Sequence, residues 1–407
     1  MKLLYIHQYF KFPDTPGGTR SYDLSKEFVK NGVDVTVITC HDSFKNLDTS
    51  KRWTYYEREG IKLWILRCDY SHMMSIPRRI WSFLIFSFFT TLKCISLKAD
   101  LVLATSTPLT VAIPAILKKW VSGTPFIFEV RDVWPEGPIQ QGFVKNKLLI
   151  KFLRRLEKFI YDRAAYVVPL SVGMERDILT RVPVKNMEVI PNISEINRFE
   201  TLKPCELDFD FTGKRVILYA GTLGPVNDIM YLAKLAKETI TMAPEICYLI
   251  LGMGKQKEMI VQYCKDNDIL NKNIFFLDRV NKENLPYVYS KVIMGSSFVW
   301  DYKIKWDNSA NKFFDTLAAG KPILINYQGW QAEVIRECHC GYVLPYNLNH
   351  DDIERFIDYA KDDKTLAEHG RNAKIKAVDY SLPVAAEKYM NVLNRVMEMD
   401  EERKKKR

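Results

Sequence analysis

Two carboxylates and a lysine lie close together in the stretch WDNSANKFFDTLAAGKPILIN, residues 306–326. Asp307 and Asp315 are eight positions apart, and Lys312 lies between them. A carboxylate only accepts hydrogen bonds and suits a pair of sugar hydroxyls, whereas the ammonium group of a lysine suits a phosphate. The stretch therefore indicates either a site for a phosphorylated sugar or nucleotide, or a plain Lys–Asp pair on a solvated helix face.

A helix is the element that must position these groups. Ser309 is a candidate N-cap, and residues 310–319 follow helical spacing until Gly320 and Pro322 end the helix. The unpaired N–H groups at the start of such a helix favour phosphate. Steps of three and four residues meet on one helix face, which we expect to carry Asn308, Asn311 or Lys312, and Asp315. The opposite face can pack on the core through Phe313, Phe314, Leu317 and Ala318.

Glycine-bearing turns follow three of the predicted strands. Gly17-Gly18 follows the first strand, and two more turns, GTLG at 221–224 and GMGK at 252–255, follow strands of the second half. Such turns let the backbone approach a ligand phosphate or sugar, although each one alone is also consistent with a plain turn. The first turn lacks the GxGxxG spacing, so it does not match a dinucleotide-binding fingerprint.

Strands and helices alternate along the whole chain, which predicts an α/β fold with parallel sheets covered on both faces. Residues 1–40 follow a strand–helix–strand pattern, with the helix from Tyr22 to Lys30. Further strands of the first half are predicted at about Ile61–Arg67, Asp100–Thr105, Pro125–Val130 and Ala165–Pro169. The second half has a similar series in RVILYAG, ICYLILGMG, NIFFLDRV, VIMGSSFVW, KPILIN and GYVLP.

A polar segment, residues 199–214, separates the two series of strands. We therefore predict two Rossmann-like, doubly wound domains, residues 1–205 and 206–380. A helix from Pro383 to Met399 and a frayed basic tail, EERKKKR, are predicted within residues 381–407, and this helix has the option of packing back on the first domain. Ligands of such domains bind at the carboxyl ends of the strands, here in a cleft between the domains.

The charge balance favours anionic partners. The 407 residues include 59 basic and 49 acidic side chains, a formal net charge of +10, which suits nucleic acid, a phosphate-bearing small molecule or an anionic membrane surface. The positive charge is not gathered into a nucleic-acid-binding module, so nucleic acid is not expected as a partner. The N-terminus MKLLYIHQYF lacks signal-peptide features, and the eight cysteines form no CxxC pair. We therefore predict a cytoplasmic chain with reduced thiols and no metal site.

The apolar stretch Ile80–Leu92 follows Arg78-Arg79 and contains five aromatic residues. It has thirteen residues without a charge, and a membrane-spanning helix needs roughly 20 apolar residues, so it is not expected to span. One interpretation is a core helix on the first sheet. The other is an interfacial helix, with residues of about 78–97 in contact with an anionic membrane.

Several motifs, taken in order, resemble glycosyltransferase family 4. GTLGPVND, ILGMGK, DRVNKENLP and SANKFFDTLAAGKPI resemble its second domain. In the first half, HQYFKFPDTPGGTR, ATSTPLTVA and FEVRDVWPEG resemble the WbuB-like subgroup of bacterial O-antigen and capsule glycosyltransferases. The resemblance implies a GT-B fold, two Rossmann-like domains that face a cleft.

The resemblance also implies a reaction. It points to a retaining glycosyltransferase that needs no metal or other cofactor. Such an enzyme would move a sugar, an N-acetylated or deoxy hexose, from a UDP-sugar to a polyprenyl-linked glycan acceptor in surface polysaccharide synthesis. It would act at the inner face of the cell membrane as a peripheral protein, which would use the aromatic stretch and the basic charge.

The resemblance assigns roles to particular residues. Asp315 matches the second glutamate of the Glu-x7-Glu motif, which binds the nucleotide ribose, and Asp307 matches the first. Asp132 and Lys312 are the catalytic candidates, beside the reacting centre and at the leaving phosphate. The expected donor-binding residues are Gly17, Gly18, Gly221, Thr222, Gly224, Arg279, Val280, Asn308, Ser309, Asn311 and Asp315. Further candidates are Asp307, Lys255, Lys305 and Arg20.

The chain departs from the family pattern at two kinds of position. Both motif glutamates are aspartates, and Thr222 and Asn227 occupy the places of an Arg/Lys pair that neutralises the donor pyrophosphate. The missing pair leaves open a non-catalytic sugar-binding subunit. A nucleotide-sugar epimerase or a sugar phosphorylase on the same fold is a further alternative, although no lysine has a distinctive pyridoxal phosphate context.

Overall fold

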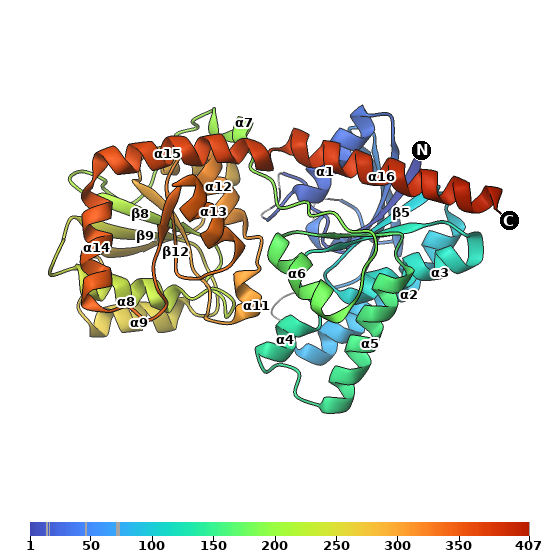
Figure 1. Ribbon diagram of the computed structural model, residues 1–407, viewed down its shortest axis with the longest axis horizontal. Helices are drawn as coiled ribbons and strands as arrows, with labels where there is room; N and C mark the ends of the chain where they lie inside the picture. The colour runs from blue at the N-terminus through green and yellow to red at the C-terminus, as the bar shows by residue number, and fades with distance from the viewer. Residues whose placement is uncertain (14, 16, 45–46, 71–73, 407) are drawn as a thin grey trace. The chain divides into compact units, whose positions relative to one another are not determined.

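Two compact units make up the chain: Met1–Pro191 together with Leu382–Arg407, and Asn192–Ser381 (Figure 1). The computed structural model describes residues 1–13, 15, 17–44, 47–70 and 74–406, so Asp14 and Pro16 of the predicted glycine loop lie outside the described residues.

The predicted boundary between residues 205 and 206 falls inside the second unit. The physical reason is that the segment before it is bonded to that unit. The backbone N–H of Asn192 donates to Oγ of Ser309 at 3.2 Å, and the Ser194 hydroxyl donates to the Phe314 carbonyl at 3.2 Å.

The first unit is built on a seven-stranded sheet in the order β3-β4-β2-β1-β5-β6-β7. Its central strands are runs of buried residues, as expected for parallel strands covered on both faces. The prediction of a wholly parallel sheet is wrong at one edge, because β3 pairs antiparallel with β4. Residues of β3 are partly exposed, so its sequence WTYYER carries no buried-strand signal. The strands are β1 Lys2–Ile6, β2 Asp34–Cys40, β3 Trp53–Arg58, β4 Ile61–Leu66, β5 Leu101–Thr105, β6 Phe126–Val130 and β7 Tyr166–Pro169.

Helices cover this sheet in two groups. In the first group, α1 and α16 contact each other. In the second group, α3 contacts both α2 and α5. The predicted frayed tail is helical instead, because α16 continues to Lys405, and Asp400 pairs within it with Arg403 at 2.6 Å and Lys404 at 2.7 Å. The helices of this unit are α1 Arg20–Lys30, α2 Ile76–Ser96, α3 Ala112–Ser122, α4 Glu136–Gln140, α5 Lys147–Arg163, α6 Val172–Arg181 and α16 Leu382–Lys405.

Helix α2 is longer than its apolar stretch. It has 21 residues, and its segment Pro77–Ser96 is long and apolar enough to cross a membrane by length and composition, with a mean hydropathy of 1.2. Only 28% of that apolar window is buried. The side chains that it buries are mostly small or polar, and they include Ser82, Thr90 and Cys94. Large apolar side chains face outward, with Trp81 at 65% and Phe88 at 60% exposure, so α2 is not an ordinary core helix.

The second unit has a six-stranded parallel sheet in the order β10-β9-β8-β11-β12-β13. This order reverses between β8 and β11, as in a doubly wound nucleotide-binding domain, and the reversal marks where ligands bind. The strands are β8 Arg215–Ala220, β9 Ile246–Leu251, β10 Ile274–Leu277, β11 Met294–Ser297, β12 Ile323–Ile325 and β13 Gly341–Val343. The helices are α7 Ile196–Phe199, α8 Ile229–Thr239, α9 Lys257–Asp266, α10 Leu285–Ser290, α11 Lys303–Trp306, α12 Asn311–Ala318, α13 Trp330–Cys338, α14 His350–Lys361 and α15 Asp363–Ala377.

Candidate active site

Helix α12 carries the central candidates and is packed tightly onto the sheet. Phe313, Phe314 and Leu317 are fully buried, as predicted from their spacing. The helix lies directly against β11, because a Cβ at Gly295 would come within 2.2 Å of Oγ1 of Thr316. The polar side of α12 is therefore held in a fixed position by its apolar side.

The start of α12 differs from the prediction. The N-cap is Ala310, and the helix begins at Asn311. Ser309 is not the cap because its hydroxyl accepts from the N–H of Asn192. The side chain of Asn308 instead accepts from the Ala310 N–H at 3.0 Å and donates to the Lys305 carbonyl at 2.6 Å. Asn308 and Ser309 thus shape the loop before the helix, whereas the side chain of Asn311 is exposed.

Lys312 reaches the turn that follows β8. A Cβ at Gly221 would lie 3.1 Å from its Nζ, so the glycine lets the ammonium group approach the backbone of this turn closely. The same Nζ lies 3.4 Å from Oδ1 of Asn227 and 5.0 Å from the centre of the Tyr219 ring. The amide of Asn227 and the hydroxyl of Tyr219 both donate to the Thr222 carbonyl at 2.9 Å. Burial lowers the pKa of Lys312 to about 8, which Asp315 only partly offsets.

Asp315 lies one turn after Lys312 and is paired with Arg198, a residue of the short helix α7. Arg198 also binds Glu195 at 2.9 Å, and Glu195 in turn pairs with Lys282. Burial raises the pKa of Asp315, and Arg198 lowers it by less. Sequence reasoning missed Arg198, because it lies just before the polar segment 199–214, in a stretch with no periodicity to mark it.

The other candidates of the second unit are brought together only in part. Gly221 and Gly224 lie in the turn beside Lys312. Gly252 and Gly254 serve packing between turns, since a Cβ at either would come within about 2 Å of a backbone oxygen of Gly221 or Leu223. The remaining candidates occupy neighbouring loops or short helices: Lys255 and Arg279 are exposed, Val280 packs on the core, Lys305 is in α11 and Asp307 follows it.

In the first unit, polar residues gather at the carboxyl ends of β1, β5 and β6. Thr107, after β5, donates to Asp132, after β6, at 2.8 Å. Arg131 lies 3.4 Å from Nε2 of His7, after β1. Burial and, to a lesser degree, Arg131 hold the pKa of His7 well below its ordinary value, so His7 is neutral. Of these residues only Asp132 was predicted, because the others have no distinctive local pattern.

Two buried side chains in this group, His7 and Gln8, have polar atoms without a hydrogen-bond partner in the described part of the chain. Within the part of the chain that the structure describes, neither Nδ1 of His7 nor the amide atoms of Gln8 have a hydrogen-bond partner. Buried polar groups are normally satisfied, so such atoms need a ligand, a water molecule or an ion. Nearby, Gly17 has a φ of +132°, and a Cβ there would lie 2.8 Å from Nζ of Lys11. Gly17 and Gly18 are exposed, as a loop that approaches a ligand would be.

Arg20 has a structural role within the first unit. Its Nε pairs with Glu129 at 2.9 Å, its Nη2 donates to the Ile190 carbonyl at 2.7 Å, and its Nη1 donates to the Pro191 carbonyl. All three nitrogens are thus engaged and the side chain is buried, so Arg20 links β6 to the segment around Ile190 and Pro191, and its contact with the donor stays a prediction.

Comparisons with known proteins agree with the division of the chain into two units. Residues 17–193 match the glycosyl transferase 4-like domain, and residues 209–377 match the glycosyl transferases group 1. An uncharacterized glycosyltransferase of Methanocaldococcus jannaschii, MJ1069, is 24% identical over 239 residues. That match covers 56% of this chain and 58% of the length of the relative.

Solved structures share the fold over nearly the whole chain. Sucrose-phosphate synthase from Thermosynechococcus elongatus superposes with a TM-score of 0.76 at 13% identity, over 98% of this chain and 99% of that one. Anabaena HepE in complex with UDP gives a TM-score of 0.71 at 14% identity, over 97% of this chain and 100% of that one. HepE has also been solved with UDP-glucose, with a TM-score of 0.70. The predicted GT-B fold is thereby confirmed.

Proposed function

We propose that this chain, which belongs to the glycosyltransferases of the GT-B fold, transfers a sugar from a UDP-sugar to a polyprenyl-linked glycan with retention of configuration. The sugar is an N-acetylated or deoxy hexose, and no metal ion or other cofactor takes part. The chain belongs to the O-antigen and capsule subgroup and acts at the inner face of the cell membrane. The domain matches, and the UDP complexes of similar folds, support a nucleotide-sugar donor.

The position of Lys312 carries this proposal. Its ammonium group is desolvated enough to lower its pKa to about 8, and its near neighbours are a neutral amide, an aromatic ring and a glycine turn. Such a cation is under-neutralised until an anion binds. The N–H of Phe313 is taken by the Ala310 carbonyl at 3.0 Å, so the N–H groups of Asn311 and Lys312 are the ones in this first turn that favour negative charge as well. A diphosphate bound here would have its developing charge stabilised as it leaves.

The carboxylate of Asp315 supplies the ribose contact in this proposal. Arg198 holds one of its oxygens, which fixes the direction of the side chain and leaves acceptor capacity for ribose hydroxyls. Lys312 and Asp315 lie on one side of α12, so phosphate and ribose would bind within one helical turn.

The first unit supplies the acceptor side of the reaction in this proposal. Asp132 is exposed and oriented by Thr107, so it is placed to orient an acceptor hydroxyl or to stabilise positive charge that develops on the sugar. The neutral His7 and the unsatisfied amide of Gln8 would hydrogen-bond a sugar. We propose no covalent nucleophile.

Helix α2 gives the proposed enzyme its membrane contact. Large apolar side chains recur along its exposed side: Ile80, Trp81, Leu84, Phe88 and Leu92. Arg78 and Arg79 lie at the start of this helix, where they can reach lipid phosphates. A lipid-linked acceptor would be available at such a surface.

A pair of lysine variants tests the donor assignment. Lys312→Met should lower sugar transfer by roughly 10²–10³ and reduce the rise in melting temperature that UDP produces. Lys321→Met is the matched control, because burial also lowers the pKa of Lys321, just beyond the same helix, and it should behave as the wild type. Unchanged transfer by Lys312→Met would show that the assignment is wrong.

Donor binding and donor turnover together distinguish the glycosyltransferase from an epimerase and from a non-catalytic binding subunit. A panel of nucleotide sugars identifies the donor by thermal stabilisation of the wild-type protein. Donor that is consumed without any acceptor would indicate an epimerase. Donor binding with no turnover under any condition would indicate a non-catalytic binding subunit, which the neutral residues Thr222 and Asn227 would then explain.

A further inference from the structure

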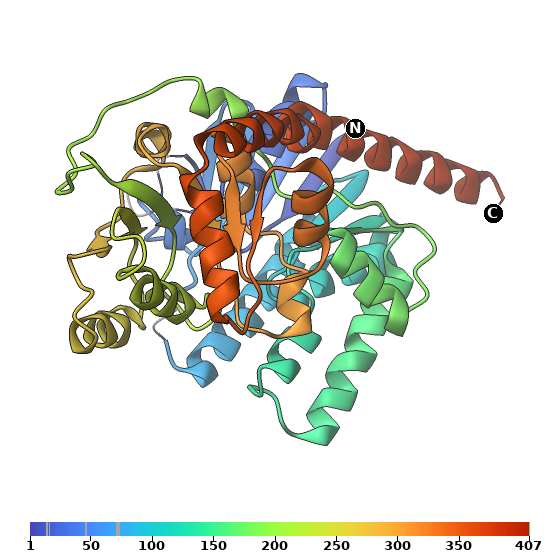
Figure 2. The same ribbon diagram turned by 60° about the vertical axis from the view of Figure 1, so that its left-hand side comes forward.

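Helix α5 carries a dense row of positive charge on the first unit. Its 17 residues, KLLIKFLRRLEKFIYDR, include six basic side chains and two acidic ones. Lys147, Lys151, Arg155 and Lys158 follow one another at steps of three or four residues, so they form a continuous stripe along the helix. Figures 1 and 2 show α5 at the lower edge of this unit, preceded by the loop that connects it to α4.

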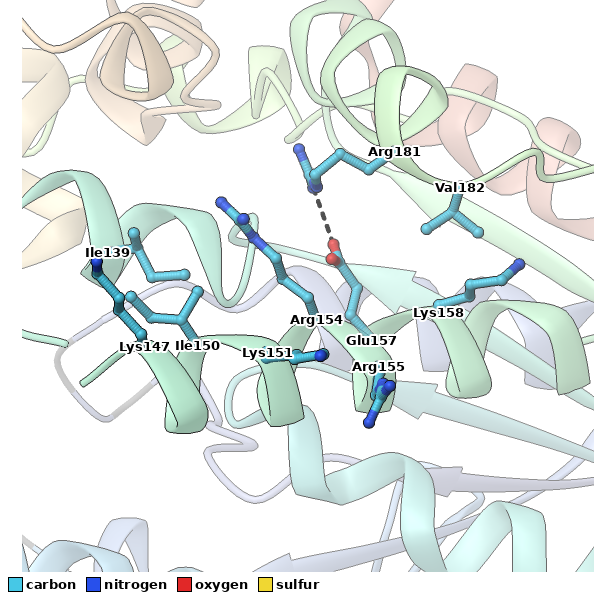
Figure 3. Close-up of a pocket in the computed structure, with 10 residues that line it drawn as sticks. All are labelled: Ile139, Lys147, Ile150, Lys151, Arg154, Arg155, Glu157, Lys158, Arg181 and Val182. Carbon is cyan, nitrogen blue, oxygen red and sulfur yellow. Dashed lines mark hydrogen bonds and ion pairs between the residues drawn. The ribbon is translucent and has the colours of Figure 1, made fainter. Parts of the chain in front are cut away.

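A groove of about 860 Å³ lies along this stripe, and Figure 3 shows the cations around it. Two of its arginines are neutralised within the protein. Arg154 binds Glu136 through two hydrogen bonds of 2.7 and 3.1 Å, and Arg181, which comes from α6, binds Glu157 at 2.9 Å.

The other cations of the groove differ in what neutralises them. Lys158 has Asp162 within 3.1 Å. In contrast, Lys147, Lys151 and Arg155 are exposed and have no acidic partner among the residues that the structure describes. The groove therefore holds at least three positive charges that the fold itself does not balance.

Large apolar side chains accompany this charge. Leu148 is 79% exposed, and Phe143, Leu149 and Phe152 are also exposed, in the first turns of α5 or in the loop before it. A further exposed aromatic side chain lies on the neighbouring helix α3, where the ring of Trp120 is 6.2 Å from that of Phe159 near the end of α5. Helix α3 also contacts α2, so α5, α3 and α2 form one layer of helices.

We propose that the basic groove of α5 and its apolar first turns form a second docking site for an anionic bilayer, separate from α2. Leu148, Phe152 and their apolar neighbours enter the interfacial region, while Lys147, Lys151 and Arg155 bind lipid phosphates. Unbalanced cations beside exposed aromatic and aliphatic side chains match a surface that is both anionic and apolar. The inference rests on the membrane location in the proposed function and adds a headgroup-binding element to it.

Vesicle co-sedimentation with the full chain tests the docking site. The wild type should bind vesicles of phosphatidylcholine with phosphatidylglycerol more tightly than vesicles of phosphatidylcholine alone. The triple variant Lys147→Gln, Lys151→Gln and Arg155→Gln should bind the anionic vesicles about 100-fold more weakly, at roughly fivefold per cation. The double variant Leu148→Ser and Phe152→Ser should weaken binding to both kinds of vesicle.

A control variant carries the same loss of charge in the second unit. Lys234→Gln, Lys237→Gln and Lys265→Gln replace exposed lysines and should leave vesicle binding within about twofold of the wild type. Anionic-vesicle binding that is equal in the α5 triple variant and the wild type would overturn the inference. An equal loss in the control variant would also overturn it, because net charge alone would then account for the binding.

Stabilisation by UDP separates this inference from the proposed function. The α5 triple variant should show the same rise in melting temperature with UDP as the wild type. A wild type that binds anionic vesicles through α5 but shows no UDP stabilisation would refute the donor assignment and leave the docking site intact. A triple variant that loses both responses is misfolded. The single variant Arg155→Gln then decides, with an expected loss of about fivefold.

Discussion

Glu129 in the first unit and Asp315 in the second are both carboxylates paired with an arginine, yet their environments differ. Glu129 is fully buried and accepts from Arg20 at 2.9 Å, Thr105 at 2.7 Å and Tyr389 at 2.5 Å. Asp315 accepts from Arg198, which is the one side chain that donates to it in the described part of the chain. Burial raises the pKa of both groups, but the outcome is opposite.

The nearby positive charges and the hydrogen-bond donors together decide this difference. Around Glu129, the effects of Arg20, Arg131, Tyr389 and Thr105 together exceed that of burial and lower the pKa to about 2. Around Asp315, burial prevails and the pKa is raised. A saturated carboxylate fixes structure, whereas an under-saturated one retains acceptor capacity for a ligand. The same residue pairing is therefore structural in one unit and suited to binding in the other.

Replacement of Glu129 should give the largest effect. Glu129→Gln should lower the free energy of unfolding by about 3 kcal/mol at neutral pH, because it leaves Arg20 buried without its counter-charge. Since the folded-state pKa lies below the ordinary 4.5, the contribution is complete above pH 4.5 and is lost as the pH falls toward 2. Urea unfolding of the wild type and the variant at neutral and acidic pH measures both values.

Glu57→Gln serves as the control for this prediction, because Glu57 is an exposed carboxylate on β3. It should change the free energy of unfolding by less than about 0.5 kcal/mol. A difference between wild type and Glu129→Gln that stays constant from pH 7 down to pH 2 would contradict the assignment of a lowered pKa.

Replacement of Asp315 should affect binding rather than folding. Asp315→Asn should weaken UDP binding by about 10- to 100-fold, as expected for the loss of hydrogen bonds to a charged acceptor. The free energy of unfolding should stay within about 1 kcal/mol of the wild-type value. Arg198 would still pair with Glu195 at 2.9 Å, and the buried charge of Asp315 is itself unfavourable. Calorimetric titration with UDP and urea unfolding measure the two quantities. A large loss of stability with unchanged UDP binding would place Asp315 in the same class as Glu129.

The pH dependence of turnover should give the smallest effect. Since the pKa of Lys312 is about 8, its charged fraction falls as the pH rises through 8, and kcat/KM for the donor should fall up to tenfold per pH unit above it. Lys312→Arg keeps the charge and should move this decline to higher pH. A kcat/KM that stays constant up to pH 10 would exclude Lys312 as the essential cation.

The free energy of unfolding should change in the opposite direction. Between pH 8 and 10.5 the unfolded chain binds more protons at Lys312 than the folded chain does, so a rise in pH favours the folded state.

Two predictions from the sequence failed for the same reason. Ser309 was expected to cap α12, and residues 192–205 were expected to belong to the first domain. In each, a distant segment took the group: Ser309 bonds to Asn192, and Ser194 bonds to Phe314, 120 positions away. No local spacing marks such partners, because they depend on which loops meet after the sheets have formed.

The sequence by itself determined the order and type of most strands and helices and the core face of α12. These properties follow from short-range sterics and from the period of apolar residues, which a local window contains. Only the tertiary structure decided what the charged groups do. It paired Asp315 with Arg198 across 117 positions, placed Lys312 against the glycine turn after β8, and turned the apolar face of α2 outward. Burial and the number of donors set the energy of a charge, and both arise only when distant segments pack together.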